Sequence, residues 1–390
     1  MDETRARARA TLSAWEPVKV AYRERVRRVN APIDEDRLAP GLPRGSTLEV
    51  GLVGGQAVIE GVMMRAPNAL AVAVRREDGG LTVLDEARPG AWRSRWWARL
   101  PLLRGTFTLI ESMQSGFRAL SFAAEQAGGG ASGSALAGLL TAAGGPGGAG
   151  ALGVSLLFAL GLFVGLPHAL TWLLGRLVGG GWDEQGLVFH LVDGLFKLGI
   201  FVGYVALIRR IPEIARVFAY HGAEHKVVNA HERGRPMALD EVRLQDTFHA
   251  RCGTSFILLV LVVSVAVFAL VLPLLPTPTG HPLLRQASLL AAKILLMIPV
   301  AGLAYETNRY AARHPRSVVA PLLVLPGRWM QRLTTREPDD AQLEVALAAL
   351  RTALAREAEA AQDRSSGLAP EPARIRRYRD FRDLDSTLAR

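Results

Sequence analysis

Four long apolar stretches constrain the fold of this 390-residue chain more than any other feature. They cover residues 152–178, 187–208, 254–275 and 283–303. A helix that crosses the hydrocarbon core of a bilayer needs about 20 mostly apolar residues. The third stretch contains VVSVAVFALVLPLL, which is apolar on every face, whereas a helix of a soluble protein normally keeps a polar face. The sequence therefore predicts a mostly α-helical membrane protein with four transmembrane helices.

The connections between these stretches differ in charge, and the difference predicts their orientation. The connections 179–186 and 276–282 contain no Lys or Arg. Positive residues gather instead in the middle connection and after the fourth stretch, at Arg209, Arg210, Arg216, Lys226, Arg233, Arg235, Arg243, Arg251, Arg309, Arg313, Arg316, Arg328 and Arg332. Positive loops stay in the cytoplasm. We therefore expect both termini and the loop 209–253 to lie in the cytoplasm.

Charge and cysteine content limit the classes of partner and site. The formal net charge of +10 suits cytoplasmic loops beside anionic lipid, so we expect the lipid bilayer as a partner and no specific nucleic-acid binding. Cys252 is the only cysteine, which excludes an intramolecular disulfide and a multi-cysteine zinc site. The N-terminus has no apolar core of signal-peptide type, so we expect the internal helices to direct insertion. The sequence does not indicate an oligomeric state.

The residues before the first span predict a small α+β cytoplasmic domain. Segment 1–45 is basic and is expected to be poorly ordered or helical. In the domain 46–127, alternating apolar residues around Asp78-Gly79-Gly80 predict a β-hairpin. Residues 96–127 predict an amphipathic helix, which packs against the hairpin or lies at the lipid interface. Segment 128–150 is almost wholly Gly, Ala and Ser, as in a flexible linker.

The rest of the chain divides into a membrane domain and a cytoplasmic C-terminal part. The membrane domain is expected at 151–306, with the loop 209–253 inside it. Region 307–362 ends in an amphipathic helix whose apolar face is Leu343, Leu347, Leu350 and Leu354. This face docks on the body of the protein or binds a helix of a partner membrane protein. Segment 363–390 is expected to be a mobile basic tail.

The most informative short motif is YHGAEHK, residues 220–226. On a helix, His221 and His225 lie one turn apart on one face and can bind one zinc ion. Glu224 between them can then act as a general base toward a water molecule at the metal. This is the residue order of the inverzincin peptidases. The alternative is an ordinary polar helix end.

A zinc site needs a third protein ligand, and several candidates share the predicted cytoplasmic surface. Glu232 follows the motif, His249 and Cys252 precede the third span, and Glu306 ends the fourth. We expect one of these four side chains to complete a divalent-metal site, most simply for zinc. His231 is an additional alternative.

Ionisable residues inside the spans form a second candidate site. His190, Asp193 and Lys197 share one face of the second span, and Lys293 lies midway through the fourth. Charged groups in a bilayer are costly, so they normally face the bundle interior and pair. Asp193 and Lys197 match the i,i+4 spacing of a helical ion pair. These residues either hold the helices together or line a proton or substrate path.

Several longer words of the sequence resemble one bacterial membrane-protein family. They are GGQAVIEGVMMR at 54–65, YHGAEHKVVNAHE at 220–232, RCGTSF at 251–256, AYE at 304–306 and LTTREPDD at 333–340. Together they resemble the family with domain of unknown function 1385. The chain departs from the family pattern at Ala250 and His231, and the Gly-rich linker looks like an insertion. The resemblance implies a multi-pass protein of the bacterial inner membrane with a suspected metal requirement, and it names no reaction.

Three functions fit these features. The leading hypothesis is a metal-dependent integral membrane enzyme, hydrolytic, that acts at the cytoplasmic surface on a lipid, a membrane protein or a peptide. The second is a non-enzymatic scaffold or assembly factor whose polar cluster holds helices in place. The third is a transporter that uses Asp193, Lys197 and Lys293.

Overall fold

The computed structural model describes residues 53–87, 100–127, 148–179, 182–184, 186–276, 281–314, 317–366 and 371–388. The expected basic segment 1–45 lies outside these ranges, as does the linker 128–150 except for its last three residues.

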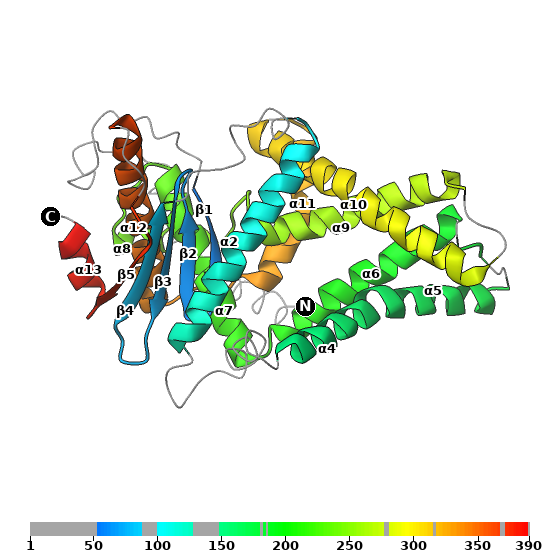
Figure 1. Cartoon of the computed structure of the whole chain (residues 1–390), viewed down its shortest axis with the longest axis horizontal. Helices are drawn as coiled ribbons and strands as arrows, with labels where there is room; N and C mark the ends of the chain where they lie inside the picture. The colour runs from blue at the N-terminus through cyan, green and yellow to red at the C-terminus, as the bar shows by residue number, and fades with distance from the viewer. Residues whose placement is uncertain are drawn as a thin grey trace, which may run out of the picture.

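A five-stranded antiparallel sheet lies at one end of the molecule, away from the long apolar helices (Figure 1). In spatial order its strands are β1 (Gly54–Val58), β2 (Gly61–Arg65), β3 (Ala69–Arg75), β4 (Leu81–Ala87) and β5 (Arg374–Tyr378). The hairpin expected at Asp78-Gly79-Gly80 is confirmed as the turn between β3 and β4. Gly79 there adopts a φ of 83°, which only glycine adopts without strain.

Helices cover both faces of the sheet. Successive side chains of a strand point to opposite faces. Val62 and Met64 therefore pack toward α7 (Pro212–Glu232) and α12 (Asp340–Ser365). Met63 and Val72 pack toward α2 (Leu103–Ala127) on the other face. The hairpin is thus the centre of a three-layer domain.

The amphipathic helices predicted on either side of the membrane region both pack on this domain. The second half of α2 contacts the sheet, and its first half contacts the fourth long apolar helix. Leu343, Leu347, Leu350 and Leu354 of α12 are buried in the core with the sheet and α7. Docking of that helix on the body is confirmed, and binding of its leucine face to a partner helix was the wrong alternative.

The expected mobile tail 363–390 is wrong for residues 371–388. Strand β5 pairs with β4, and α13 (Phe381–Leu388) packs on α12. The basic residues of β5 meet acidic ones: Arg374 lies directly opposite Asp85, which is buried. Opposite charges across a strand pair stabilise it, so a segment that reads as a basic tail becomes an edge strand. The N-terminal domain 46–127 is therefore not a separate unit.

Within the described residues, four helices are long and apolar enough to cross a membrane, and they coincide with the four stretches predicted as spans. The first, Gly153–Leu177, joins α4 (Gly148–Leu160), the π-helical turn η3 (Gly161–Gly165) and α5 (Leu166–Leu177). The others are α6 (Leu187–Ile208), α9 (Gly253–Val271) with η4 (Leu272–Leu274), and α10 (Pro282–Arg313). Only 6% to 28% of each apolar window is buried inside the protein, so lipid is the solvent these surfaces suit.

The middle segment 209–253 is not an irregular loop. It folds mainly into α7 and the short α8 (Leu239–Arg243), and α7 packs against both β1 and α12. Helix α11 (Ala320–Thr334) packs against α9 and leads into α12. The motif 220–226 therefore lies on a helix, as its spacing predicts, and the sheet and α12 pack against that helix.

Candidate metal centre

Helix α7 places the motif 220–226 in the most enclosed part of the molecule. Pro212 occupies its first turn, where the missing N–H costs nothing. Every residue from Tyr220 to Ala230 is buried, because β1 and α12 pack on the helix and the segment after α11 crosses it. His225 is completely buried, and His221 is 7% exposed. These histidines are therefore not an ordinary solvated helix end.

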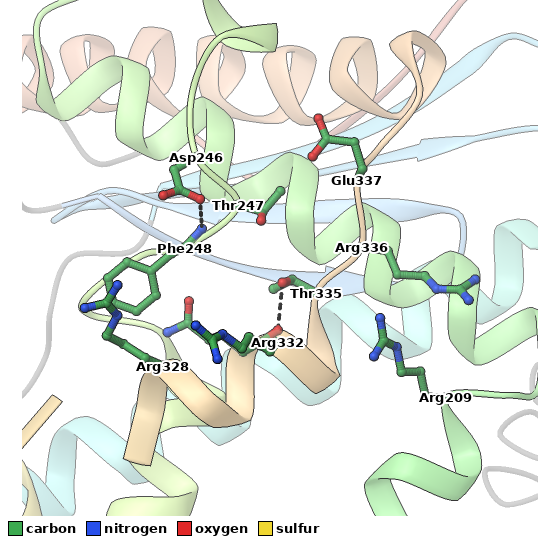
Figure 2. A pocket seen from close by; sticks show the side chains of 10 residues that line it. Arg209, Asp246, Thr247, Phe248, Arg328, Arg332, Thr335, Arg336 and Glu337 are labelled. Atoms are coloured by element: carbon green, nitrogen blue, oxygen red, sulfur yellow. Dashed lines mark hydrogen bonds between the residues drawn. The ribbon is translucent and has the colours of Figure 1, made fainter. Parts of the chain in front are cut away.

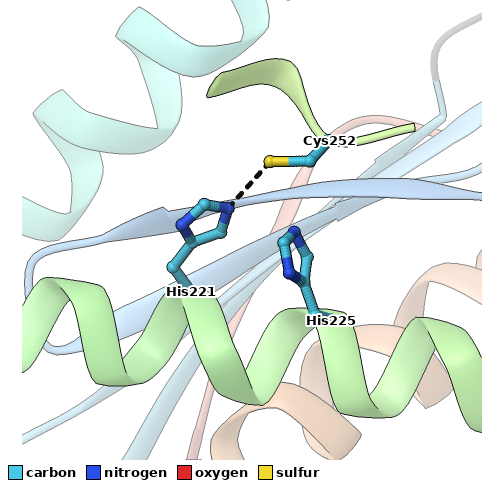
Figure 3. Close-up of side chains that lie close together, drawn as sticks. All are labelled: His221, His225 and Cys252. Carbon is cyan, nitrogen blue, oxygen red and sulfur yellow. Dashed lines mark hydrogen bonds between the residues drawn. The ribbon is translucent and has the colours of Figure 1, made fainter. Parts of the chain in front are cut away.

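Backbone carbonyl groups orient both imidazole rings. Nδ1 of His221 lies 2.8 Å from the carbonyl oxygen of Thr334, and Nδ1 of His225 lies 2.5 Å from that of Thr247. A carbonyl only accepts hydrogen bonds, so each Nδ1 carries the proton and donates. Nε2 of both rings is left to face the same space, toward Cys252 (Figure 3). This is the arrangement that fixes metal-binding histidines in proteins.

Cys252 completes a group of three ligand atoms. It caps the start of α9, and its Sγ lies 3.2 Å from Nε2 of His221. The ligand atoms of His221, His225 and Cys252 all lie within 4.8 Å of one another. Nε2 of His225 is buried and has no hydrogen-bond partner among the described residues. Two imidazoles and a thiol form a donor set that suits zinc, so these residues fit the ion.

His221 and Cys252 stabilise each other's charged forms. Burial by itself lowers the pKa of His221, but the charge and hydrogen bond of Cys252, together with Glu224, raise it to about 9. Burial raises the pKa of the Cys252 thiol, and the two imidazoles more than offset this and bring the pKa well below its usual range. The thiolate is the form of cysteine that binds metal and acts as a nucleophile.

Glu224 lies beside the ligand group without joining it. Its Oε2 is 3.8 Å from Nε2 of His221 and 4.0 Å from Nε2 of His225. Strand β1 approaches this carboxylate closely: a Cβ at Gly55 would stand 2.6 Å from Cγ of Glu224. Glycine at position 55 therefore leaves the space that Glu224 occupies. The carboxylate is placed to accept a proton near the ligand atoms.

The other expected ligands have separate partners. Nε2 of His249 lies 3.0 Å from Oε1 of Glu232, which also pairs with Arg251. Burial raises the pKa of Glu232, but His249 and Arg251 outweigh burial and lower it. The His249 ring is 5.7 Å from that of His225, so this pair is a neighbour of the ligand group. Glu306 binds Arg104 of α2 instead and is not in the group.

Sequence reasoning missed the groups that support the site. The carbonyls of Thr247 and Thr334 carry no residue-type signal, because every residue has one. Gly55 and Gly222 had a signal: both lie inside the words GGQAVIEGVMMR and YHGAEHKVVNAHE that carry the family resemblance. A glycine inside a helix or strand often marks a close approach of another chain segment.

The polar residues of the second and fourth long apolar helices lie near one another. Nζ of Lys197 lies 2.5 Å from Oδ2 of Asp193 on α6. Lys293 of α10 is close enough to interact electrostatically with both, and with His190. Asp193 is thus the common counter-charge of a mainly positive cluster. The cluster links two of the long apolar helices.

Fold and site together define a class: a helical protein whose described part has four potential membrane spans, with two buried histidines of α7 beside the cysteine that precedes the third span. A family model of proteins of unknown function, DUF1385, matches residues 100–356. The chain therefore belongs to the DUF1385 family, as its sequence words predict. It is also 33% identical over 306 residues to the uncharacterized protein YqhQ of Bacillus subtilis strain 168, covering 75% of this chain and 89% of that protein. No solved structure matches it.

Gly222→Ala should disturb the site, because Gly222 of α7 lies against the segment that follows α11. A Cβ at position 222 would lie 2.0 Å from the carbonyl oxygen of Arg336, a backbone atom. The methyl group must displace the segment that begins at Thr334, whose carbonyl holds His221. We expect the free energy of unfolding to fall by about 2 kcal/mol. Thermal unfolding in detergent measures this.

Gly199→Ala in α6 is the matched control. Nothing lies within 4 Å of a Cβ placed there, so alanine should be neutral or slightly stabilising. Equal melting temperatures for the two variants would show that α7 does not need the close approach at Gly222.

Proposed function

We propose that this chain is a zinc-dependent integral membrane hydrolase whose ion is held by His221, His225 and Cys252. The observation that carries the proposal is Nε2 of His225, a buried acceptor without a partner among the described residues, which faces the same space as Nε2 of His221 and Sγ of Cys252. A buried polar atom without a partner costs about 1–3 kcal/mol, and a cation bound there removes that cost. Bound zinc supplies Lewis-acid chemistry, polarising the scissile group and lowering the pKa of water.

Glu224 is the proposed general base. Its carboxylate lies within about 4 Å of both Nε2 atoms but is not one of the three clustered ligands. It can therefore take a proton from an attacking water and return it to the leaving group, as general acid–base catalysis requires. The Glu224→Gln variant tests this role, because it should keep zinc and lose hydrolysis.

The substrate class follows from where the centre lies. Cys252 directly precedes α9, one of the four long apolar helices. A scissile bond at this position belongs to a molecule at or in the membrane surface, that is, a lipid, a membrane protein or a peptide held there. The hydrogen-bonded pair of Glu232 and His249 lies beside the ligand group.

A non-enzymatic scaffold remains the second candidate, and the low exposure of the ligands favours it. Cys252 is 5% exposed and His225 is completely buried, as in the closed sites of structural zinc. In a scaffold the ion would tie α7 to α9 and would need no proton acceptor. Glu224→Gln would then be as active in the cell as the wild type.

We also propose that both termini and α7 face the cytoplasm, on the strength of the loop charges. A cysteine introduced by Ser386→Cys on the exposed side of α13 should react with a membrane-impermeant maleimide in inverted vesicles and stay unlabelled in intact cells. Cys252 is buried and should label slowly from both sides, so it supplies the background. Rapid labelling of the Ser386→Cys variant in intact cells would reverse the proposed orientation.

A further inference from the structure

A polar pocket of about 450 Å³ lies beside the metal centre, and arginines dominate its walls (Figure 2). Arg328 and Arg332 come from α11, Arg336 follows that helix, and Arg209 directly follows α6. Asp246 and Glu337 complete its charged lining. Two segments far apart in the sequence, residue 209 and residues 328–336, therefore bring four guanidinium groups to one cavity.

These arginines lack the carboxylate partners that other described arginines have, such as Arg216 with Glu60 and Arg243 with Asp340. Among the described residues, no ion pair involves Arg209, Arg328, Arg332 or Arg336. Arg328 stacks on the ring of Phe248 with its Cζ 5.2 Å from the ring centroid. The two acids are already engaged. Oδ1 of Asp246 accepts the N–H of Phe248 at 3.1 Å, and Oε1 of Glu337 accepts from Nζ of Lys226 at 2.6 Å. The pocket is left with a positive charge that suits an anion.

The chemistry of the lining indicates which anion. Guanidinium groups bind phosphate through paired N–H donors. Several guanidinium groups together offer more N–H donors than the two oxygens of one carboxylate can accept. Thr247 and Thr335 add hydroxyl groups to the walls. A cavity of about 450 Å³ is within the range of small-molecule sites, and it holds a phosphate with the group esterified to it.

The surroundings of the pocket place it at the level of lipid headgroups. Arg209 comes one residue after Ile208, the last residue of an apolar span. Helix α11 exposes apolar side chains next to its arginines: Leu322 is 68% exposed and Trp329 is 65% exposed. Tryptophan is enriched at the boundary between headgroups and hydrocarbon. A helix with exposed Leu and Trp beside arginine suits the surface of an anionic membrane.

We propose that this pocket binds the phosphate group of an anionic phospholipid headgroup. It is a site separate from the metal centre, since it shares none of the three ligands, and it does not depend on hydrolase activity. The two sites share their supporting segments. Thr247 lines the pocket and its carbonyl orients His225, while Thr335 lines the pocket and follows Thr334, whose carbonyl orients His221. A bound headgroup therefore holds the backbone that holds both histidines.

Native mass spectrometry of the full-length protein in detergent tests the proposal with three probes. Phosphatidylglycerol should remain bound at least tenfold more tightly than zwitterionic phosphatidylcholine. Inorganic phosphate at the same concentration should not displace phosphatidylglycerol. The double variant Arg332→Gln/Arg336→Gln should weaken phosphatidylglycerol binding at least tenfold. Arg309→Gln, at the end of α10 outside the pocket, should bind like the wild type.

Two results would overturn the proposal. Equal phosphatidylglycerol binding by the wild type and the double variant would exclude the pocket as the site. Displacement of phosphatidylglycerol by inorganic phosphate would mean that the pocket takes a soluble phosphate and not a lipid. If Arg332→Gln/Arg336→Gln does not fold, Arg209→Gln/Arg328→Gln removes the same amount of charge at two other positions of the pocket and is judged by the same two results.

Discussion

Purified protein should carry about one zinc ion per chain, and the His225→Ala variant should carry none. Two imidazole nitrogens and one thiolate at a shared point form a site with three protein ligands. Removing one ligand leaves two, and the metal affinity should fall by several orders of magnitude. His221→Ala and Cys252→Ala should lose the ion equally. Metal analysis of the detergent-purified variants by inductively coupled plasma mass spectrometry measures the content.

The control for this experiment is His314→Ala. His314 lies exposed after α10 and stacks on Tyr310, far from the ligand group in the sequence and outside it in the structure. Its removal should leave the zinc content unchanged. The same loss of zinc in His314→Ala would point to adventitious metal on surface histidines.

Glu224→Gln separates binding from catalysis. It should retain zinc, because Glu224 is outside the group of three, and should lose hydrolysis by about 10²-fold or more. Fragments released from a bacterial membrane extract, detected by mass spectrometry, report hydrolysis. Glu213→Gln, in the first turn of the same helix, is the matched control and should act like the wild type. Wild-type protein that stays folded and fully functional after chelation would leave the scaffold as the better account.

Asp193→Leu should be the most damaging change inside the membrane region. Asp193 is buried and faces Lys197, and Lys293 and His190 lie nearby. Its removal leaves two lysines without a counter-charge in a low-dielectric environment, which should cost about 3 kcal/mol or more. Lys197→Leu should cost less, since Lys293 can still pair with Asp193. Thermal unfolding of the purified variants measures the order.

The double variant Asp193→Leu/Lys197→Leu should fall between the two single variants, because Lys293 alone then lacks a partner. Leu195→Ala, at a position that is 67% exposed, is the control and should change stability little. Equal stability of Asp193→Leu and Lys197→Leu would show that Asp193 is not the shared counter-charge. A double variant that folds well but loses function would favour a transport path over a structural role.

The spans and the hairpin could be predicted because local physics decides them. A helix such as 254–275 has no polar face that could be exposed to water in a soluble protein. Its surface therefore suits lipid. The Asp78-Gly79-Gly80 turn carries the glycine that its backbone requires. Strand β5 could not be predicted in the same way. Its RIRRY sequence is typical of a basic tail. It becomes a strand because it pairs with β4, where Arg374 lies opposite Asp85, 289 positions earlier in the chain.

The candidate site also has one part that local sequence predicts and another part that depends on contacts between distant segments. Helical spacing alone predicted that His221, Glu224 and His225 lie together, and the structure has them on one helix with the Glu224 carboxylate near both Nε2 atoms. The choice of Cys252 over Glu306 depended on contacts across the fold. Arg104 binds Glu306, and nothing near either residue in the sequence indicates the pairing. The backbone carbonyl groups that orient the histidines could not be predicted either, because every residue has one.

One sheet contains strands β1–β4 from the first quarter of the chain and β5 from its last 20 residues. This arrangement has a consequence for synthesis. Strand β4 ends at Ala87, but α12, which covers the face of strands β2–β4, begins only at Asp340. At roughly 5–20 residues per second, the ribosome needs on the order of 10–50 s to make the intervening chain. During that time the apolar face of the early strands is uncovered while the four long apolar helices are being made. A truncated chain never closes that face, so an unfinished product should be open to proteases and chaperones, and only complete chains can form the site.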